Sequence, residues 1–224
     1  DLGPHNMFCE AIRGVRSAVK FGASGKSHQV LVVTSATPGD GKSTFTVNFA
    51  ATLASAGQKT LLIDADLRRG TSCYYFDQPR DPGLTEILTG ELHWMDVVNE
   101  TPFQNMDVIH TGRLAVNPGE LLLSPILEEL IAQVREHYEY VIFDCPPLTA
   151  IDDAFSIMKL ADGTLFVVRA GRTTMRFAKS SLLEAQKRGV EIMGIILNGI
   201  TTSLDPDATV TDLWAGDSCT RIFT

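Results

Sequence analysis

The sequence lacks several features that would place the chain in a common class of protein. No run of apolar residues reaches the roughly 18 residues of a transmembrane helix, and no signal peptide opens the chain. The four cysteines, Cys9, Cys73, Cys145 and Cys219, are widely spaced and include no Cys-x-x-Cys pair. This spacing argues against a metal site and favours free thiols in a reducing compartment.

Basic residues are also few. The 19 Lys and Arg residues are outnumbered by 27 Asp and Glu residues, so the formal net charge is -8. Because nucleic acids and anionic membranes are themselves negative, this balance argues against broad affinity for either, although it allows a local basic patch. We therefore expect no nucleic-acid partner.

The length and composition of the chain predict one domain. A chain of 224 residues that is 44% hydrophobic can bury a single sizeable core. Within residues 1–224 we expect an N-terminal helix over 8–21, a core over 28–198 and a polar, loosely held tail over 201–224. Residue 1 is Asp rather than Met, so we expect an excised domain or a processed product.

The stretch from residue 29 to residue 56 has the form of a phosphate-binding loop. A buried strand over 30–34 is followed by a glycine-rich turn and by a helix that opens at Lys42. In such a loop, backbone N–H groups and the helix N-terminus face an anion, and the lysine reaches the outer phosphates. The full pattern has glycine six residues before the lysine, where this chain has Ala36. The nucleotide-binding residues predicted here are Gly39, Asp40, Gly41, Lys42, Ser43 and Thr44.

Carboxylates end two further strands of buried character. The apolar stretch over 59–66 ends in Asp64 and Asp66, and the stretch over 140–147 contains Asp144. Acids at the carboxyl ends of parallel strands lie where open α/β sheets bind ligands, and they can hold Mg²⁺ or accept a proton. Surface acids, or acids that cap helices, are the alternative interpretation of each.

The rest of the chain alternates between helices and short apolar strands. We predict helices over 83–89, 93–99, 124–137, 152–160 and 174–188, and strands over 106–110, 164–168 and 192–198. This alternation predicts an α/β fold with a mostly parallel sheet covered by helices on both faces. Asn198 ends the last strand, where it hydrogen-bonds a nucleobase or serves as an ordinary turn residue; the pattern leaves both open.

Three motifs in this order resemble the bacterial tyrosine kinases, the BY-kinase family. They are SATPGDGKST, LLIDADLRRG and VIFDCPP, which match the Walker A, Walker A′ and Walker B motifs of that family. The segment Glu10-x-x-Arg13-x-x-Arg16 resembles its oligomerisation motif, and 117–125 is similar to a further family segment. Taken alone, the helix over 8–21 has only an ordinary solvated face; the resemblance implies a contact between subunits.

The resemblance implies a P-loop NTPase architecture like that of the Min and Par ATPases, and a Mg·ATP-dependent protein tyrosine autokinase. Lys42 would bind the β- and γ-phosphates, and Ser43 would ligate Mg²⁺. Asp64 would act as the base for the tyrosine hydroxyl or orient it, Asp66 would lie in the metal shell, and Asp144 would hold Mg²⁺.

The family also implies partners and a location. The chain would assemble as a ring in which one subunit phosphorylates the next, and it would control capsule or exopolysaccharide synthesis and export. It would be fused to, or activated by, a transmembrane co-polymerase at the cytoplasmic face of the cell membrane.

One departure keeps other functions open. The family usually ends in a tyrosine cluster, but residues 199–224 contain no tyrosine, and the chain has only Tyr74, Tyr75, Tyr138 and Tyr140. A Min/Par-type ATPase switch is the first alternative, although such switches carry a second lysine where this chain has Thr37. A module that binds nucleotide without kinase activity is the second.

Overall fold

One parallel-stranded sheet organises the structure, a computed structural model that describes residues 4–21, 28–148, 153–200 and 221–223. Within these residues the strands are β1 (Val30–Ser35), β2 (Thr60–Asp64), β3 (Asn99–Glu100), β4 (Met106–Ile109), β5 (Tyr140–Asp144), β6 (Gly163–Arg169), β7 (Ile192–Asn198) and β8 (Arg221–Phe223). The helices are α1 (Pro4–Lys20), α2 (Lys42–Ser55), α3 (Ser72–Phe76), α4 (Leu84–Leu88), α5 (Trp94–Val97), α6 (Pro118–Leu122), α7 (Pro125–His137), α8 (Asp153–Leu160) and α9 (Met175–Lys187).

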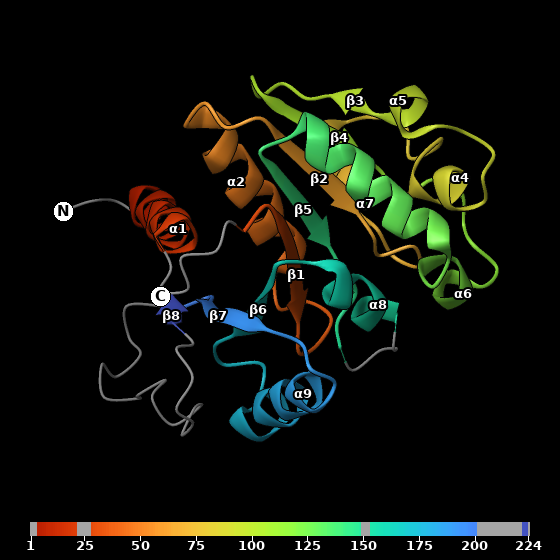
Figure 1. The fold of residues 1–224 in the computed structure, drawn as a ribbon. Helices are drawn as coiled ribbons and strands as arrows, with labels where there is room; N and C mark the ends of the chain where they lie inside the picture. Colours follow the sequence, from red (N-terminus) through yellow and green to blue (C-terminus); the bar gives the residue numbers. More distant parts are fainter. Residues whose placement is uncertain (1–3, 22–27, 149–152, 201–220, 224) are drawn as a thin grey trace.

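The strands follow the spatial order β3-β4-β2-β5-β1-β6-β7-β8 (Figure 1). Every neighbouring pair is parallel except β3 and β4, which are antiparallel. This confirms the predicted mostly parallel sheet. Strand β5 comes late in the sequence but lies between β1 and β2, so the strands that end in the predicted site are neighbours.

Alternate residues of each central strand supply two separate cores, because successive side chains on a strand point to opposite faces. In β1, Val30 and Val32 belong to a cluster with residues of α4 to α9, whereas Leu31 and Val33 pack with α1 and α2. Figure 1 shows α1 beside α2, with α7 on the other side of the sheet. Both faces are therefore covered, as the continuous apolar strands predicted.

Several short elements are absent from the predicted pattern. Helices α3 and α6 have five residues each, and β3 has two. Segments this short contain little more than one turn, so they leave no hydrophobic period in the sequence. Strand β8 lies within the segment predicted as a tail and pairs with β7; the positions 201–220 lie outside the described residues.

Candidate active site

The glycine-rich turn joins β1 to α2 in the shape expected of a phosphate cradle. Gly39 and Gly41 have φ angles of 86° and 91°, in the left-handed region that glycine adopts at little cost. Gly41 is the N-cap of α2, and the intrahelical bonding begins with the N–H of Phe45 donating to the Gly41 carbonyl at 2.9 Å. The first N–H groups of α2 therefore have no partners within the helix and can face an anion.

The ammonium of Lys42 lies between two carboxylates from different strands. Its Nζ is 3.3 Å from Asp66 Oδ2 and 3.4 Å from Asp144 Oδ1, and both acids are almost fully buried. Burial by itself would lower the pKa of Lys42, but the charges of Asp144, Asp66 and Asp64 raise this pKa above its ordinary value. Lys42 therefore carries a positive charge at any physiological pH.

Asp64 is completely buried beneath this group. Its carboxylate accepts hydrogen bonds from two backbone N–H groups, that of Asp66 at 3.2 Å and that of Ser72 at 2.9 Å. Burial, and next the neighbouring charge of Asp144, raise the pKa of Asp64 to about 6. A carboxylate with a pKa this close to neutral is a stronger proton acceptor than an ordinary aspartate.

Asp144 is paired in register with Asp64, because β5 and β2 are neighbours. Burial raises the pKa of Asp144, whereas the charge of Lys42 and a hydrogen bond from the Ser43 hydroxyl lower it. Ser43 also accepts a hydrogen bond from Lys42 at 3.2 Å. The predicted residues Lys42, Ser43, Asp64, Asp66 and Asp144 thus come together at the carboxyl ends of β1, β2 and β5.

This donor set fits Mg²⁺. The ion prefers oxygen ligands, retains several waters and is usually held by one or two carboxylates together with substrate phosphates. Ser43, Asp66 and Asp144 would supply the protein oxygens. No group of three or more His, Cys, Asp or Glu side chains able to hold a metal occurs among the described residues.

Three other predicted residues make contacts within the protein. The Asp40 carboxylate is buried and accepts hydrogen bonds from the backbone N–H and the hydroxyl of Thr37, both at 2.9 Å. Asn198 donates from Nδ2 to the backbone carbonyl of Asp40 at 2.9 Å. Thr44 makes a 2.8 Å hydrogen bond with the hydroxyl of Tyr75. Asn198, from the end of β7, thus binds the cradle at the Asp40 carbonyl.

Sequence reasoning missed the residues that support Asp64. Ser72 holds the carboxylate through its N–H, and its hydroxyl lies 2.8 Å from His110 Nδ1. His110 is fully buried, and its Nε2 lies 3.0 Å from Gln78 Oε1. Burial lowers the pKa of His110 to about 4, so the ring is neutral at pH 7. No motif in the sequence marks His110, because its partners Ser72 and Gln78 lie on other segments.

The two arginines after Asp66 do not join the site. Arg68 pairs with Asp153 of α8 at 3.1 Å. Arg69 is exposed and approaches Asp66 only through its backbone N–H, at 3.0 Å. Neither guanidinium group forms an ion pair with Asp64 or Asp66.

Three residues of the predicted oligomerisation motif lie on α1. Glu10 and Arg13 form an ion pair with each other in which both side chains are more than half exposed. Arg16 reaches α2 of the same chain, where Nη1 lies 3.3 Å from the carbonyl of Thr52. The apolar face of α1 packs against the core, whereas Glu10 and Arg13 are exposed and Arg16 is half-buried.

Comparison with known proteins adds a family to this geometry. Residues 28–183 match the model of a family described as an AAA domain. The chain is 35% identical over 204 residues to the putative tyrosine-protein kinase EpsB of Ralstonia nicotianae, covering 91% of this chain but 27% of that protein. It is 30% identical to the putative tyrosine-protein kinase CapB of Staphylococcus aureus, covering 87% of this chain and 86% of that one. The chain thus spans about a quarter of the length of EpsB and most of CapB.

Solved structures with similar folds include a kinase domain of the same kind. The kinase domain of the Escherichia coli tyrosine kinase ETK superposes with a TM-score of 0.84 at 34% identity, covering 90% of this chain and 79% of that chain. The cell division ATPase MinD of Pyrococcus furiosus gives a TM-score of 0.64 at 25% identity, covering 76% and 71%. The likeness to the kinase domain is therefore greater and more complete than the likeness to MinD.

Proposed function

The chain belongs to the family of bacterial tyrosine-protein kinases, and on this premise we propose that it transfers the γ-phosphoryl group of Mg·ATP to protein tyrosine. The observation that carries the proposal is the Lys42 ammonium lying 3.3 Å from Asp66 and 3.4 Å from Asp144, at the helix N-terminus of a phosphate cradle. Phosphoryl transfer requires mainly positioning and neutralisation of charge, which this arrangement supplies.

In the proposed reaction the tyrosine oxygen attacks the γ-phosphorus while Asp64 takes the hydroxyl proton. The bond between the γ-phosphorus and the oxygen bridging it to the β-phosphate breaks, and ADP leaves with that oxygen. Lys42 and the N–H groups at the start of α2 bind the phosphate oxygens. Bound Mg²⁺ would neutralise further phosphate charge, held by Ser43, Asp66 and Asp144.

The substrate we propose is a tyrosine of another protein chain. Of the four tyrosines, Tyr138 is buried and donates to Asp107 at 2.8 Å, and Tyr140 lies within β5. Tyr74 is 82% exposed and open to a neighbouring molecule, whereas Tyr75 is 44% exposed and its hydroxyl is hydrogen-bonded to Thr44. We further propose that the partner is a transmembrane polysaccharide co-polymerase, which would place the kinase at the inner face of the membrane. No described helix is long and apolar enough to span a bilayer.

A Min/Par-type switch is less favoured by the cradle itself. Such switches place a lysine at the position of Thr37. Here the Thr37 hydroxyl is tied inward, 2.9 Å from Asp40 Oδ1 and 3.1 Å from Thr173 Oγ1. No cation reaches out of the loop from this position toward a second molecule.

The proposal predicts phosphotyrosine on an added tyrosine-rich peptide after incubation with Mg·ATP. Phosphotyrosine detection and phosphate release are measured side by side on the same samples. Phosphate release without phosphotyrosine would favour the ATPase switch. Nucleotide binding with neither phosphotyrosine nor released phosphate would favour the module that binds nucleotide without kinase activity.

The exposed pair on α1 gives a separate prediction about assembly. We propose that Glu10, Arg13 and Arg16 contact the next subunit of a ring, and that Arg13→Ala combined with Arg16→Ala lowers the mass in solution to that of the monomer. Light scattering measures the mass. Lys20→Ala, at the end of the same helix, is the control and should leave the mass unchanged. An unaltered mass in the double variant would remove this helix from the interface.

A further inference from the structure

The apex of the phosphate cradle is held from outside by the turn between β6 and α9. Arg169 ends β6 and pairs in register with Asn198 at the end of β7. From this position Arg169 Nη1 donates to the backbone carbonyl of Gly39 at 3.1 Å. Asn198 makes the matching contact with the next carbonyl, that of Asp40, at 2.9 Å. Two successive carbonyls of the cradle are thus bound by side chains of neighbouring strands.

The same turn also binds the one buried acid of the cradle. Thr173 donates from Oγ1 to Asp40 Oδ1 at 2.5 Å, and Thr37 contributes its hydroxyl and its N–H to the same carboxylate. Asp40 is fully buried, so a lost hydrogen bond cannot be replaced by water without opening the loop. Its carboxylate therefore joins the start of the loop, at Thr37, to the chain that precedes α9.

Side chains lie against both glycines of this apex. A Cβ at Gly39 would lie 2.8 Å from the guanidinium carbon of Arg172, and one at Gly41 would lie 2.1 Å from Asn198 Nδ2. The side chains of Arg172 and Asn198 thus occupy the space that a larger residue would need.

These contacts have a consequence for the inner surface. In a phosphate-binding loop, the N–H groups line the concave side and bind the anion. Because Arg169 and Asn198 bind the carbonyls of Gly39 and Asp40, they restrain the rotation of the peptide groups that those carbonyls share with the next N–H. The N–H of Gly41, which shares a peptide group with the Asp40 carbonyl, is then held ready for phosphate before any nucleotide arrives. The N–H of Asp40 instead donates to the Thr37 carbonyl at 3.4 Å and closes the turn.

We propose that the side chains of Arg169, Thr173 and Asn198 form a clamp that holds residues 37–41 in the phosphate-binding conformation. They are positioning residues for the nucleotide, and Asn198 acts on the cradle rather than on the base. This inference rests on the proposed function, since it concerns the same nucleotide site. It adds a segment, 169–173, that no nucleotide motif in the sequence marks.

The test uses Thr173→Val, which keeps the shape of the side chain and removes its hydroxyl. The Mg·ATP dissociation constant is measured by titration calorimetry, and the thermal midpoint is measured without nucleotide. We expect Thr173→Val to weaken Mg·ATP binding about tenfold, because a hydrogen bond to a buried charge is lost. Thr173→Ser restores the hydroxyl and should restore the binding. Thr174→Val is the matched control, since Thr174 is exposed and makes no side-chain capping bond.

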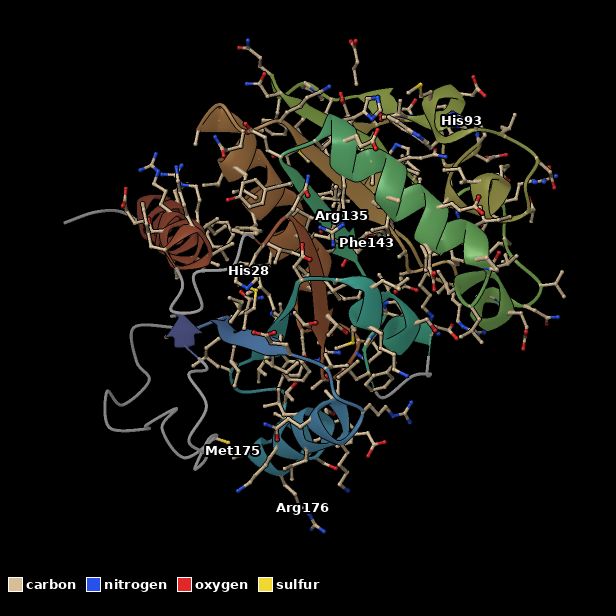
Figure 2. All side chains as sticks on the ribbon, viewed as in Figure 1. His28, His93, Arg135, Phe143, Met175 and Arg176 are labelled. Atoms are coloured by element: carbon tan, nitrogen blue, oxygen red, sulfur yellow. The ribbon has the colours of Figure 1, made fainter. Side chains whose placement is uncertain are left out.

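A second pair of variants tests the clamp through charge. Arg169→Gln removes the guanidinium that binds the Gly39 carbonyl and should weaken Mg·ATP binding by a similar factor. Arg176→Gln is its control, because Arg176 points away from the cradle at the start of α9 (Figure 2). A merely structural role would lower the thermal midpoint of the variants and leave their Mg·ATP affinity at the wild-type value.

The possible outcomes distinguish a failure of the clamp proposal from a failure of the proposed kinase function. If the wild-type protein binds Mg·ATP and phosphorylates the peptide, while Thr173→Val and Arg169→Gln bind as the wild type does, the clamp is wrong and the proposed function stands. If the variants bind less tightly but the wild-type protein yields no phosphotyrosine, the kinase proposal is wrong and the clamp stands.

Discussion

Replacing Lys42 with methionine is expected to reduce phosphotyrosine formation by about 10³-fold or more, because charge neutralisation at the phosphates is the main source of catalysis in phosphoryl transfer. Methionine retains most of the length of the lysine side chain and removes its charge. Among the described residues, the Lys42 ammonium is the only cation that contacts Asp66 and Asp144. The variant therefore loses phosphate binding and the balance of charge among the acids together.

The measurement is the initial rate of phosphotyrosine formation at saturating Mg·ATP, with circular dichroism to verify folding. Removal of Lys42 leaves Asp64, Asp66 and Asp144 without their common cation, so a lower thermal midpoint is expected as well. Lys59→Met is the matched control, because Lys59 is exposed before β2, at the opposite end of that strand. A folded Lys42→Met protein with wild-type activity would show that the cradle is not the site of transfer.

Replacing Asp64 with asparagine is expected to lower the rate of transfer by about 10²- to 10⁴-fold, the usual contribution of a general base. Asparagine has almost the same shape, but its amide cannot take the tyrosine proton. Burial and the charge of Asp144 raise the pKa of Asp64 to about 6, which suits this carboxylate to accepting a proton near neutral pH. Mg·ATP binding should persist, because neither Lys42 nor the predicted Mg²⁺ ligands are changed.

The decisive result is a slower transfer by Asp64→Asn with an unchanged affinity for Mg·ATP. Calorimetry gives the Mg·ATP affinity of Asp64→Asn, and a single-turnover assay gives its rate of phosphotyrosine formation. Asp96→Asn in α5 is an exposed control of identical chemistry and should match the wild type in both. Retention of the wild-type rate by Asp64→Asn would exclude Asp64 as the base and leave deprotonation to another group.

Much of the fold could be predicted because its signals are local. The strand before Gly39, the helix that opens at Lys42 and the apolar runs that end in Asp64 and Asp144 each lie within about ten residues of sequence. Their periodicity and turn chemistry are properties of that window alone. The short helices α3 and α6 were missed for the same reason, since their few residues contain too little of a period.

The supporting residues of the site could not be predicted in this way. Ser72 and His110 carry no motif, yet one binds Asp64 and the other binds Ser72. Thr173 and Asp40 are 133 positions apart and share a hydrogen bond of 2.5 Å. Such pairs arise only when strands distant in the sequence become neighbours, and a single sequence does not indicate which strands pair.

The sequence by itself determined the identity of the chemical groups in the cradle: a glycine-rich turn, its lysine and the acids that end two buried strands. Only the tertiary structure decided which of these meet. The strand order places β5 between β1 and β2, and the register of β2 and β5 sets Asp144 opposite Asp64. Both acids therefore lie near Lys42. The same sheet brings the ends of β6 and β7 against the cradle. Contacts between strands are non-local, so they depend on the packing of the whole sheet rather than on the residues of any one segment.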